Sequence, residues 1–338
     1  MNTKRHGFTL IELLIVIAII SLLISLIVPA VQSSRSAARK VTCQNNMRQV
    51  ALAAQQFVNS KGHFPTAGGN PQAFDTRLSA NGVERAGWAF QILTYLEQSA
   101  LYQYGHEYPS NEDIPALGMR ITEVKIPIYT CPDRGVRESL PFGDGIVNAF
   151  IDYAGVMTDW GDQGTNETPP TEENLLKAWR GIIAKGGHYK AESPQGPVFY
   201  QYTKVTPASV TDGLSTTILF MEKSARPEWY VTHEYWDAPS WAFNADWATM
   251  RLIRKPLYAD AAPREEQDLS HEHGFGSPHV GGVVTAFGDG SVRTLSFDLR
   301  NHFDFVDEDK SGVLRWLGSR DDNHVIDMKD TIEREVEE

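Results

Sequence analysis

The longest apolar run of the chain lies at its beginning. From Phe8 to Val28 the residues are apolar or small hydroxyl residues, except for Glu12. As a helix, about 21 residues rising about 1.5 Å each span roughly 30 Å, the hydrocarbon thickness of a bilayer. No comparable run follows Val31. The pattern therefore predicts a single membrane-spanning helix over 8–28.

A helical pattern continues after this run with a different distribution of apolar residues. These recur at spacings of three and four, which is typical of an amphipathic helix: Met47, Val50, Ala51, Ala54, Phe57 and Val58. Gly62 and Pro65 end the pattern. We expect one helix from Phe8 to about Phe57, with 29–60 as its amphipathic continuation, and a kink where Pro29 removes a backbone hydrogen bond.

The rest of the chain predicts a globular head over 61–330. Three segments carry strand-like apolar runs: 125–133, 150–156 and 208–224. Two further runs in 283–297 are separated by Asp289–Gly290, a strong hairpin signal. Segment 87–104 predicts a helix, and 157–197, rich in Gly, Pro and acidic residues, a surface insertion with a short helix near its middle.

These elements together predict an α+β fold. A long N-terminal transmembrane and amphipathic helix is packed on a mainly antiparallel β-sheet head with loop insertions, and an acidic tail follows at 331–338. The formal net charge of −12 argues against binding nucleic acid through its phosphates. Lys4 and Arg5 before the apolar run favour a cytoplasmic N-terminus and an exported head.

Glu12 decides between three interpretations of the N-terminus. A cleaved secretory signal would need a shorter apolar core and a better cut site than "VPA" at 28–30. A plain uncleaved anchor leaves Glu12 unexplained, because an acidic residue at a membrane helix centre costs about 2.5–3.5 kcal/mol. The segment "GFTLIELLIVIAIISLLISLIVPA" resembles the cleavage and methylation motif of type IV prepilins and type II secretion pseudopilins, which explains both features.

The resemblance to prepilins implies how the N-terminus is processed. A prepilin peptidase would cut between Gly7 and Phe8, remove leader 1–7 and methylate the new amine of Phe8. Glu12 falls where the family places the glutamate that follows the cut. It can then neutralise the positive amine of its own helix or a neighbour's, since such a pair is strong in low dielectric.

A second resemblance covers most of the chain. The segments "AARKVTCQNNMRQVALAAQQF", "IPIYTCPD", "DYAG", "VTDGLSTTILFMEKS" and "HVGGVVTAFGDGSVRTLSF" occur in the order of a large family of pilin-like bacterial proteins. That family, best known from planctomycetes, is named for a domain of unknown function. Its C-terminal signature, a histidine, nine residues and Asp-Gly, is matched by His279, Asp289 and Gly290. This resemblance implies architecture and location more than activity.

Two clusters of residues are candidate metal sites. His271, His273 and His279 with Asp289 have no recognised zinc spacing, and ten extended residues would separate His279 from Asp289 by about 30 Å. We therefore expect Asp289 to form a turn and His279 to hydrogen-bond backbone. A second, acidic cluster matches only the opening of a calcium loop, without its glutamate, and an acidic turn is the preferred interpretation: Asp307, Asp309 and Ser311.

Cys43 and Cys131 are the two cysteines of the sequence, and both fall in the exported part. A disulfide would link the long helix to the head, but spacing alone leaves two separate buried thiols open. The aromatic segment 228–247 is expected to be mainly core, with ligand binding as the alternative.

No catalytic motif is present in the sequence, and we expect neither an enzyme nor a cofactor. The predicted function is a pilin- or pseudopilin-like subunit of an envelope fibre or secretion apparatus. It would sit in the inner membrane with a periplasmic or extracellular head, and its partners would be prepilin peptidase and copies of itself or homologous subunits. The alternative is a stand-alone anchored module that binds polysaccharide or protein.

Overall fold

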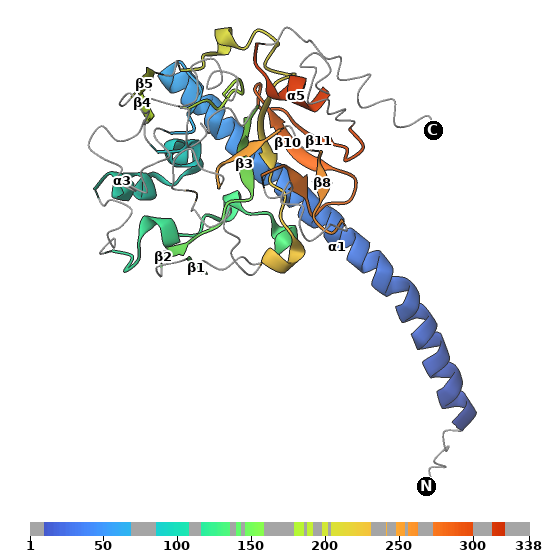
Figure 1. The fold of residues 1–338 in the computed structure, drawn as a ribbon. Helices are drawn as coiled ribbons and strands as arrows, with labels where there is room; N and C mark the ends of the chain where they lie inside the picture. The colour runs from blue at the N-terminus through green and yellow to red at the C-terminus, as the bar shows by residue number, and fades with distance from the viewer. Residues whose placement is uncertain are drawn as a thin grey trace.

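The computed structural model describes thirteen segments and one single residue of the chain. These are 10–68, 86–107, 116–135, 140–142, 146–158, 179–185, 188–191, 198–201, 204–230, 241, 248–253, 256–262, 273–299 and 313–321. A long helix runs into a head made of a central sheet, short helices and connecting turns (Figure 1).

Helix α1 (Leu10–Lys61) is continuous over 52 residues, about 78 Å, as predicted. It passes through Pro29 without interruption and curves along the half that projects from the head (Figure 1). Every residue from Leu10 to Arg35 is exposed. In the second half of α1, the predicted amphipathic stripe is the side that is buried: Met47, Val50, Ala51, Ala54, Phe57 and Val58.

The head is organised around a five-stranded sheet in the order β11-β10-β6-β3-β7. The strands are β3 (Tyr153–Met157), β6 (Ile218–Glu222), β7 (Met250–Leu252), β10 (Val283–Phe287) and β11 (Val292–Leu295). All neighbouring pairs are antiparallel except β3–β7, which is parallel. The α+β class with a mainly antiparallel sheet is therefore confirmed.

Both faces of the sheet are covered, which explains why its central strands read as continuous apolar runs. On β10, Val284 and Ala286 join the core that includes the stripe of α1. Val283 and Phe287 point to the other face, into a smaller core with helix α5 (Val313–Gly318). The alternation follows from the two-residue period of a strand.

Smaller elements surround the sheet. Three two-stranded ribbons are formed by β1 (Leu140–Phe142) with β2 (Ile146–Asn148), β4 (His188–Ala191) with β5 (Val198–Gln201), and β8 (Tyr258–Ala259) with β9 (Gly276–Ser277). Single 3₁₀ turns are η3 (Ile121–Glu123), η6 (Pro207–Ser209) and η7 (Pro227–Trp229).

Two predicted elements differ in the structure. The helix expected over 87–104 is divided into α2 (Trp88–Gln91), η2 (Leu93–Leu96) and α3 (Ser99–Glu107). Glu97, in a left-handed backbone conformation with φ of 60°, separates η2 from α3. The prediction of a strand over 125–133 is wrong. Prolines open two 3₁₀ turns there, η4 (Pro127–Tyr129) and η5 (Pro132–Arg134).

The predicted β10–β11 hairpin is present, and its turn is one residue longer than the two-residue turn expected. Phe287 N–H donates to the carbonyl of Ser291 at 2.9 Å, which leaves three residues, Gly288 to Gly290, in the loop. Gly290 has φ of +84°, the left-handed position that such a loop requires. The short helix expected near 172–180 falls mostly outside the described residues.

Candidate functional site

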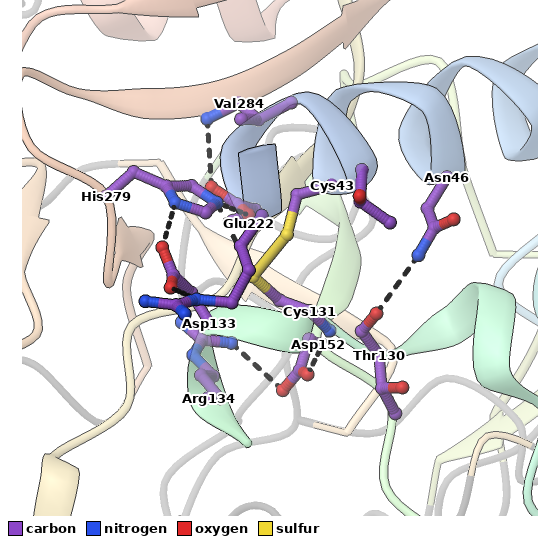
Figure 2. The surroundings of a disulfide bond; sticks show 12 residues. Cys43, Asn46, Thr130, Cys131, Asp133, Arg134, Asp152, Glu222, His279 and Val284 are labelled. Atoms are coloured by element: carbon purple, nitrogen blue, oxygen red, sulfur yellow. Dashed lines mark hydrogen bonds and ion pairs between the residues drawn. A yellow bond between two sulfur atoms is a disulfide. The ribbon is translucent and has the colours of Figure 1, made fainter. Parts of the chain in front are cut away.

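The candidate site lies where α1 meets the head. The structure joins Cys43 of α1 to Cys131 by a disulfide across 88 residues of sequence, with 5.4 Å between the two Cα atoms (Figure 2). Both cysteines are fully buried. The bond fastens the helix to the loop between η4 and η5, because Pro132 begins η5 directly after Cys131.

The backbone around Cys131 is held by buried charge. Asp152 accepts a hydrogen bond from the Cys131 N–H at 2.7 Å and forms an ion pair with Arg134 at 2.9 Å (Figure 2). Arg134 also donates to Asp260 at 2.9 Å. These three charged side chains are almost fully buried, so the ion pairs compensate for lost hydration. Their geometry fixes the position of the Cys131 loop against the sheet.

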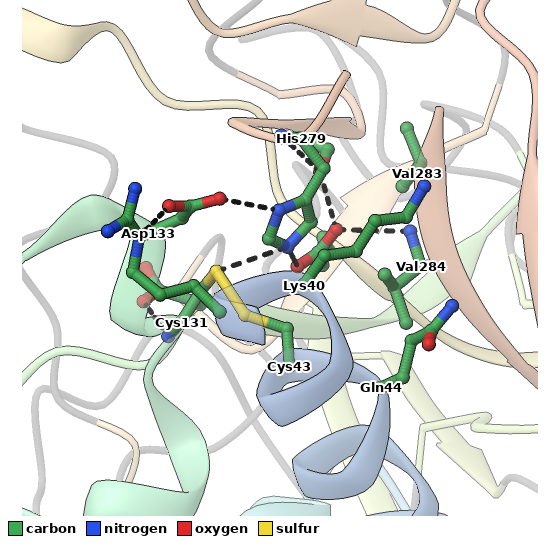
Figure 3. A network of polar contacts seen from close by, with 12 residues as sticks. Lys40, Cys43, Gln44, Cys131, Asp133, His279, Val283 and Val284 are labelled. Atoms are coloured by element: carbon green, nitrogen blue, oxygen red, sulfur yellow. Dashed lines mark hydrogen bonds and ion pairs between the residues drawn. A yellow bond between two sulfur atoms is a disulfide. The ribbon is translucent and has the colours of Figure 1, made fainter. Parts of the chain in front are cut away.

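His279 lies beside the disulfide and contacts three side chains (Figure 3). Its Nδ1 is 2.9 Å from Asp133 Oδ2, and its Nε2 is 3.2 Å from Glu222 Oε1 and 3.4 Å from Cys131 Sγ. Burial alone would lower the pKa of His279. The hydrogen bond and charge of Glu222, followed by those of Asp133, outweigh burial and raise the pKa above its usual value.

The two carboxylates beside His279 are held from behind. Glu222 Oε2 accepts hydrogen bonds from Ser277 Oγ at 2.7 Å and from the Val284 N–H at 3.0 Å. Asp133 Oδ1 accepts a hydrogen bond from Arg39 Nε, which comes from α1. Residues from α1, η5, β6 and the loop after β9 therefore meet at one buried point.

Further polar contacts tie α1 to the head along its length. Asn46 Nδ2 donates to the carbonyl of Thr130 at 3.2 Å, and Lys40 Nζ donates to that of Val280 at 3.3 Å. Gln55 donates to the carbonyl of Gly288 in the β10–β11 turn. The helix is thus attached at both ends of β10.

The sequence-predicted residues fall into separate places. The imidazole of His279 contacts side chains, so the expectation that it would hydrogen-bond backbone is wrong. Asp289 lies in the β10–β11 turn, as expected, and its Oδ1 accepts a hydrogen bond from the Ser291 N–H at 2.9 Å. His279 and Asp289 thus lie beyond opposite ends of β10 (Val283–Phe287), as the sequence suggested. Glu12 is on the exposed half of α1. Several other candidates lie outside the described residues: Gly7, Phe8, His271, Asp307, Asp309 and Ser311.

Sequence reasoning missed Asp133 and Glu222 as members of the site. Glu222 ends the apolar run of β6 and is fully buried, and an acidic residue closing such a run was a usable signal. Asp133 follows Cys131 by two residues, but only the 3₁₀ turn η5 aims it at His279.

Two family models match the chain. A model for a family described as "Protein of unknown function (DUF1559)" matches residues 32–299, most of the chain. The chain belongs to the DUF1559 family. A second model, the prokaryotic N-terminal methylation motif, matches residues 2–28. No curated protein and no solved structure matches the chain.

The methylation motif and helix α1 make this DUF1559 protein a pilin-like envelope protein. Among the described residues, α1 alone is long and apolar enough to cross a membrane, judged by length and composition. The motif implies processing by a prepilin peptidase and association with a membrane. The signature residues of the family resemblance, His279 and Gly290, lie beyond opposite ends of β10.

Proposed function

We propose that this DUF1559 protein is a non-enzymatic, pilin- or pseudopilin-like subunit of an envelope fibre or secretion apparatus. It is anchored in the inner membrane through α1, with its N-terminus cytoplasmic before cleavage and its head on the periplasmic or extracellular side. The observation that carries the proposal is the exposed apolar half of α1, from Leu10 to Val31, which projects from a head with an extensive buried core.

An apolar surface of this length must be covered by lipid or by other apolar helices. Cleavage at the matched methylation motif would leave an amine on Phe8 next to this surface, and on a helix Glu12 would lie about one turn from that amine. Pairing between a carboxylate and an amine in low dielectric favours one axial register between neighbouring helices. Both features support assembly through α1 rather than anchoring alone.

The structure gives less support to a stand-alone binding module. The segment 228–247 was its candidate surface, and there Trp241 is fully buried, with its indole Nε1 donating to the carbonyl of Val124 at 2.8 Å. Tyr230 donates to buried Asp260 at 2.7 Å. These two aromatic side chains contribute to packing and to the charge network of the head.

Cysteine crosslinking in native membranes tests assembly. Head-to-tail contacts join different positions of identical chains, so a chain carrying both Val16→Cys and Ile27→Cys should form a ladder of crosslinked subunits with a thiol-reactive reagent. Glu12→Ala should still insert, because a charge is removed from the lipid-facing segment, but the ladder should be lost. Glu12→Gln, which keeps shape without charge, should be intermediate.

Two results would count against this proposal. A wild-type background that yields only monomers would favour the stand-alone module. Equal ladders from the wild-type background and from Glu12→Ala would show that the carboxylate plays no part in assembly.

A further inference from the structure

The disulfide, His279 and Glu222 also form a cluster of potential metal ligands. One donor atom from each of Cys43, Cys131, Glu222 and His279 lies within 4.8 Å of the other three, and all four residues are buried. Two sulfurs, an imidazole nitrogen and a carboxylate oxygen are the ligand types that zinc prefers. In the described chain these atoms converge from α1, the loop before η5, strand β6 and the loop after β9.

The distances suit a tetrahedral ion. Zinc bonds of 2.0–2.3 Å place neighbouring ligand atoms about 3.3–3.8 Å apart. His279 Nε2 is 3.2 Å from Glu222 Oε1 and 3.4 Å from Cys131 Sγ, close to that range without an ion present. In the oxidised protein the two sulfurs are bonded to each other and so cannot bind an ion as thiolates.

The surroundings orient the ligands as in known metal sites. A ligating histidine usually donates its second ring nitrogen to a carboxylate, and here His279 Nδ1 is 2.9 Å from Asp133 Oδ2. Glu222 Oε2 accepts hydrogen bonds from Ser277 Oγ and the Val284 N–H, and Oε1 is the oxygen turned towards His279 (Figure 2). This second layer of contacts is already complete in the oxidised protein.

We propose that reduction of the Cys43–Cys131 disulfide turns this cluster into a binding site for a divalent metal ion of the zinc class. A dithiol reductant supplies two electrons, the S–S bond breaks, and the dithiol becomes a disulfide. The two cysteine thiols lose their protons to solvent when the ion binds through both sulfurs, His279 Nε2 and Glu222 Oε1. The ion then holds α1 to the head in place of the disulfide.

The reverse reaction follows the same balance. An incoming disulfide accepts two electrons from the bound thiolates, the Cys43–Cys131 bond forms again, and the ion is released. Metal binding is therefore confined to the reduced protein. The site lies at the junction between helix and head, so metal binding does not depend on assembly through the exposed half of α1.

Zinc binding by the full-length, detergent-solubilised chain tests the proposal. Protein reduced with a dithiol, freed of reductant without oxygen and titrated with Zn²⁺ against a chromophoric chelator should bind one ion per chain that oxidised protein does not bind. Co²⁺ in place of Zn²⁺ should give a sulfur-to-metal charge-transfer band and the visible spectrum of a tetrahedral ion.

Variants identify the ligands. His279→Ala and Glu222→Gln should each weaken Zn²⁺ binding at least tenfold, and Asp133→Asn should weaken it 10–100-fold through the orientation of His279. The double variant Cys43→Ala/Cys131→Ala should lose the site. His63→Ala is the matched control, because His63 lies beyond the end of α1, about 30 Å from Cys43, and should bind as wild type.

Three outcomes would overturn the proposal. These are a reduced chain that binds no more Zn²⁺ than the oxidised chain, a double cysteine variant that binds equally well, and full retention of affinity in His279→Ala. The first comparison uses wild-type protein throughout, so it stands even if a variant fails to fold.

Discussion

Removing the Cys43–Cys131 disulfide should destabilise the head strongly. The bond closes a loop of 88 residues between α1 and the start of η5. Constraining an unfolded chain over that length is worth about 4.6 kcal/mol at 25 °C in the chain-entropy description. Both sulfurs are fully buried, and the loop around Cys131 is already held by Asp152, so we expect most of this free energy to be lost in the variant.

The perturbation is the double variant Cys43→Ala/Cys131→Ala, which leaves no buried unpaired thiol. Urea unfolding of the full chain in detergent, followed by tryptophan fluorescence with a metal chelator present, measures the change. With an m value of about 3 kcal/mol/M, a loss of about 4 kcal/mol moves the midpoint down by roughly 1.3 M. Wild-type protein treated with a dithiol and chelator should move by a similar amount.

A midpoint change below about 0.3 M, or about 1 kcal/mol, would refute this reasoning. It would mean that packing of the amphipathic stripe and the polar contacts of α1 hold the helix without the disulfide. A changed slope with an unchanged midpoint would instead indicate that the variant changes how much surface is exposed on unfolding.

Two further predictions concern His279 and the glycines that precede β10. In oxidised protein, the stabilising contribution of His279 should be complete below pH 6.5 and be lost as pH rises through its raised pKa. The difference in unfolding free energy between wild type and His279→Gln should therefore shrink from pH 6 to 9. A constant difference would contradict this prediction. Gly282→Ala should lower the free energy of unfolding by about 2–3 kcal/mol, because its φ is +148° and a Cβ would lie 2.1 Å from the Leu295 carbonyl oxygen. Gly281→Ala, with φ of +89° and open space, is the control and should cost only about 1–2 kcal/mol in chemical denaturation.

The elements that the sequence predicted well are those with a strong local period. The stripe from Met47 to Val58 buries one face of α1, and the β-rich runs on either side of Asp289–Gly290 form the β10–β11 hairpin. Predictions failed where a single residue overrides the pattern. Glu97 interrupts the helix over 87–104, and Pro127 and Pro132 turn an apolar run that looked like a strand into two 3₁₀ turns.

The candidate site was less predictable for a different reason. Its members come from distant parts of the chain, and only folding brings His279 to Glu222 and to Asp133. Sequence spacing correctly separated His279 from Asp289, but it did not indicate which side chains His279 would contact. Tertiary neighbours of this kind cannot be predicted from spacing. The sequence did contain two signals of unusual acidic residues: Glu222 closes an apolar run, and Asp133 lies two residues after Cys131.

The most direct test of the account is the N-terminus of the mature chain. Tryptic peptides from envelope-purified protein, analysed by mass spectrometry, should show Phe8 as the first residue, carrying one methyl group on its amine. In Gly7→Val the peptidase should fail to cut, because a branched side chain would stand beside the scissile bond, and the unprocessed N-terminus should remain. Wild-type protein that keeps Met1, or whose mature chain begins near Val31, would contradict the account.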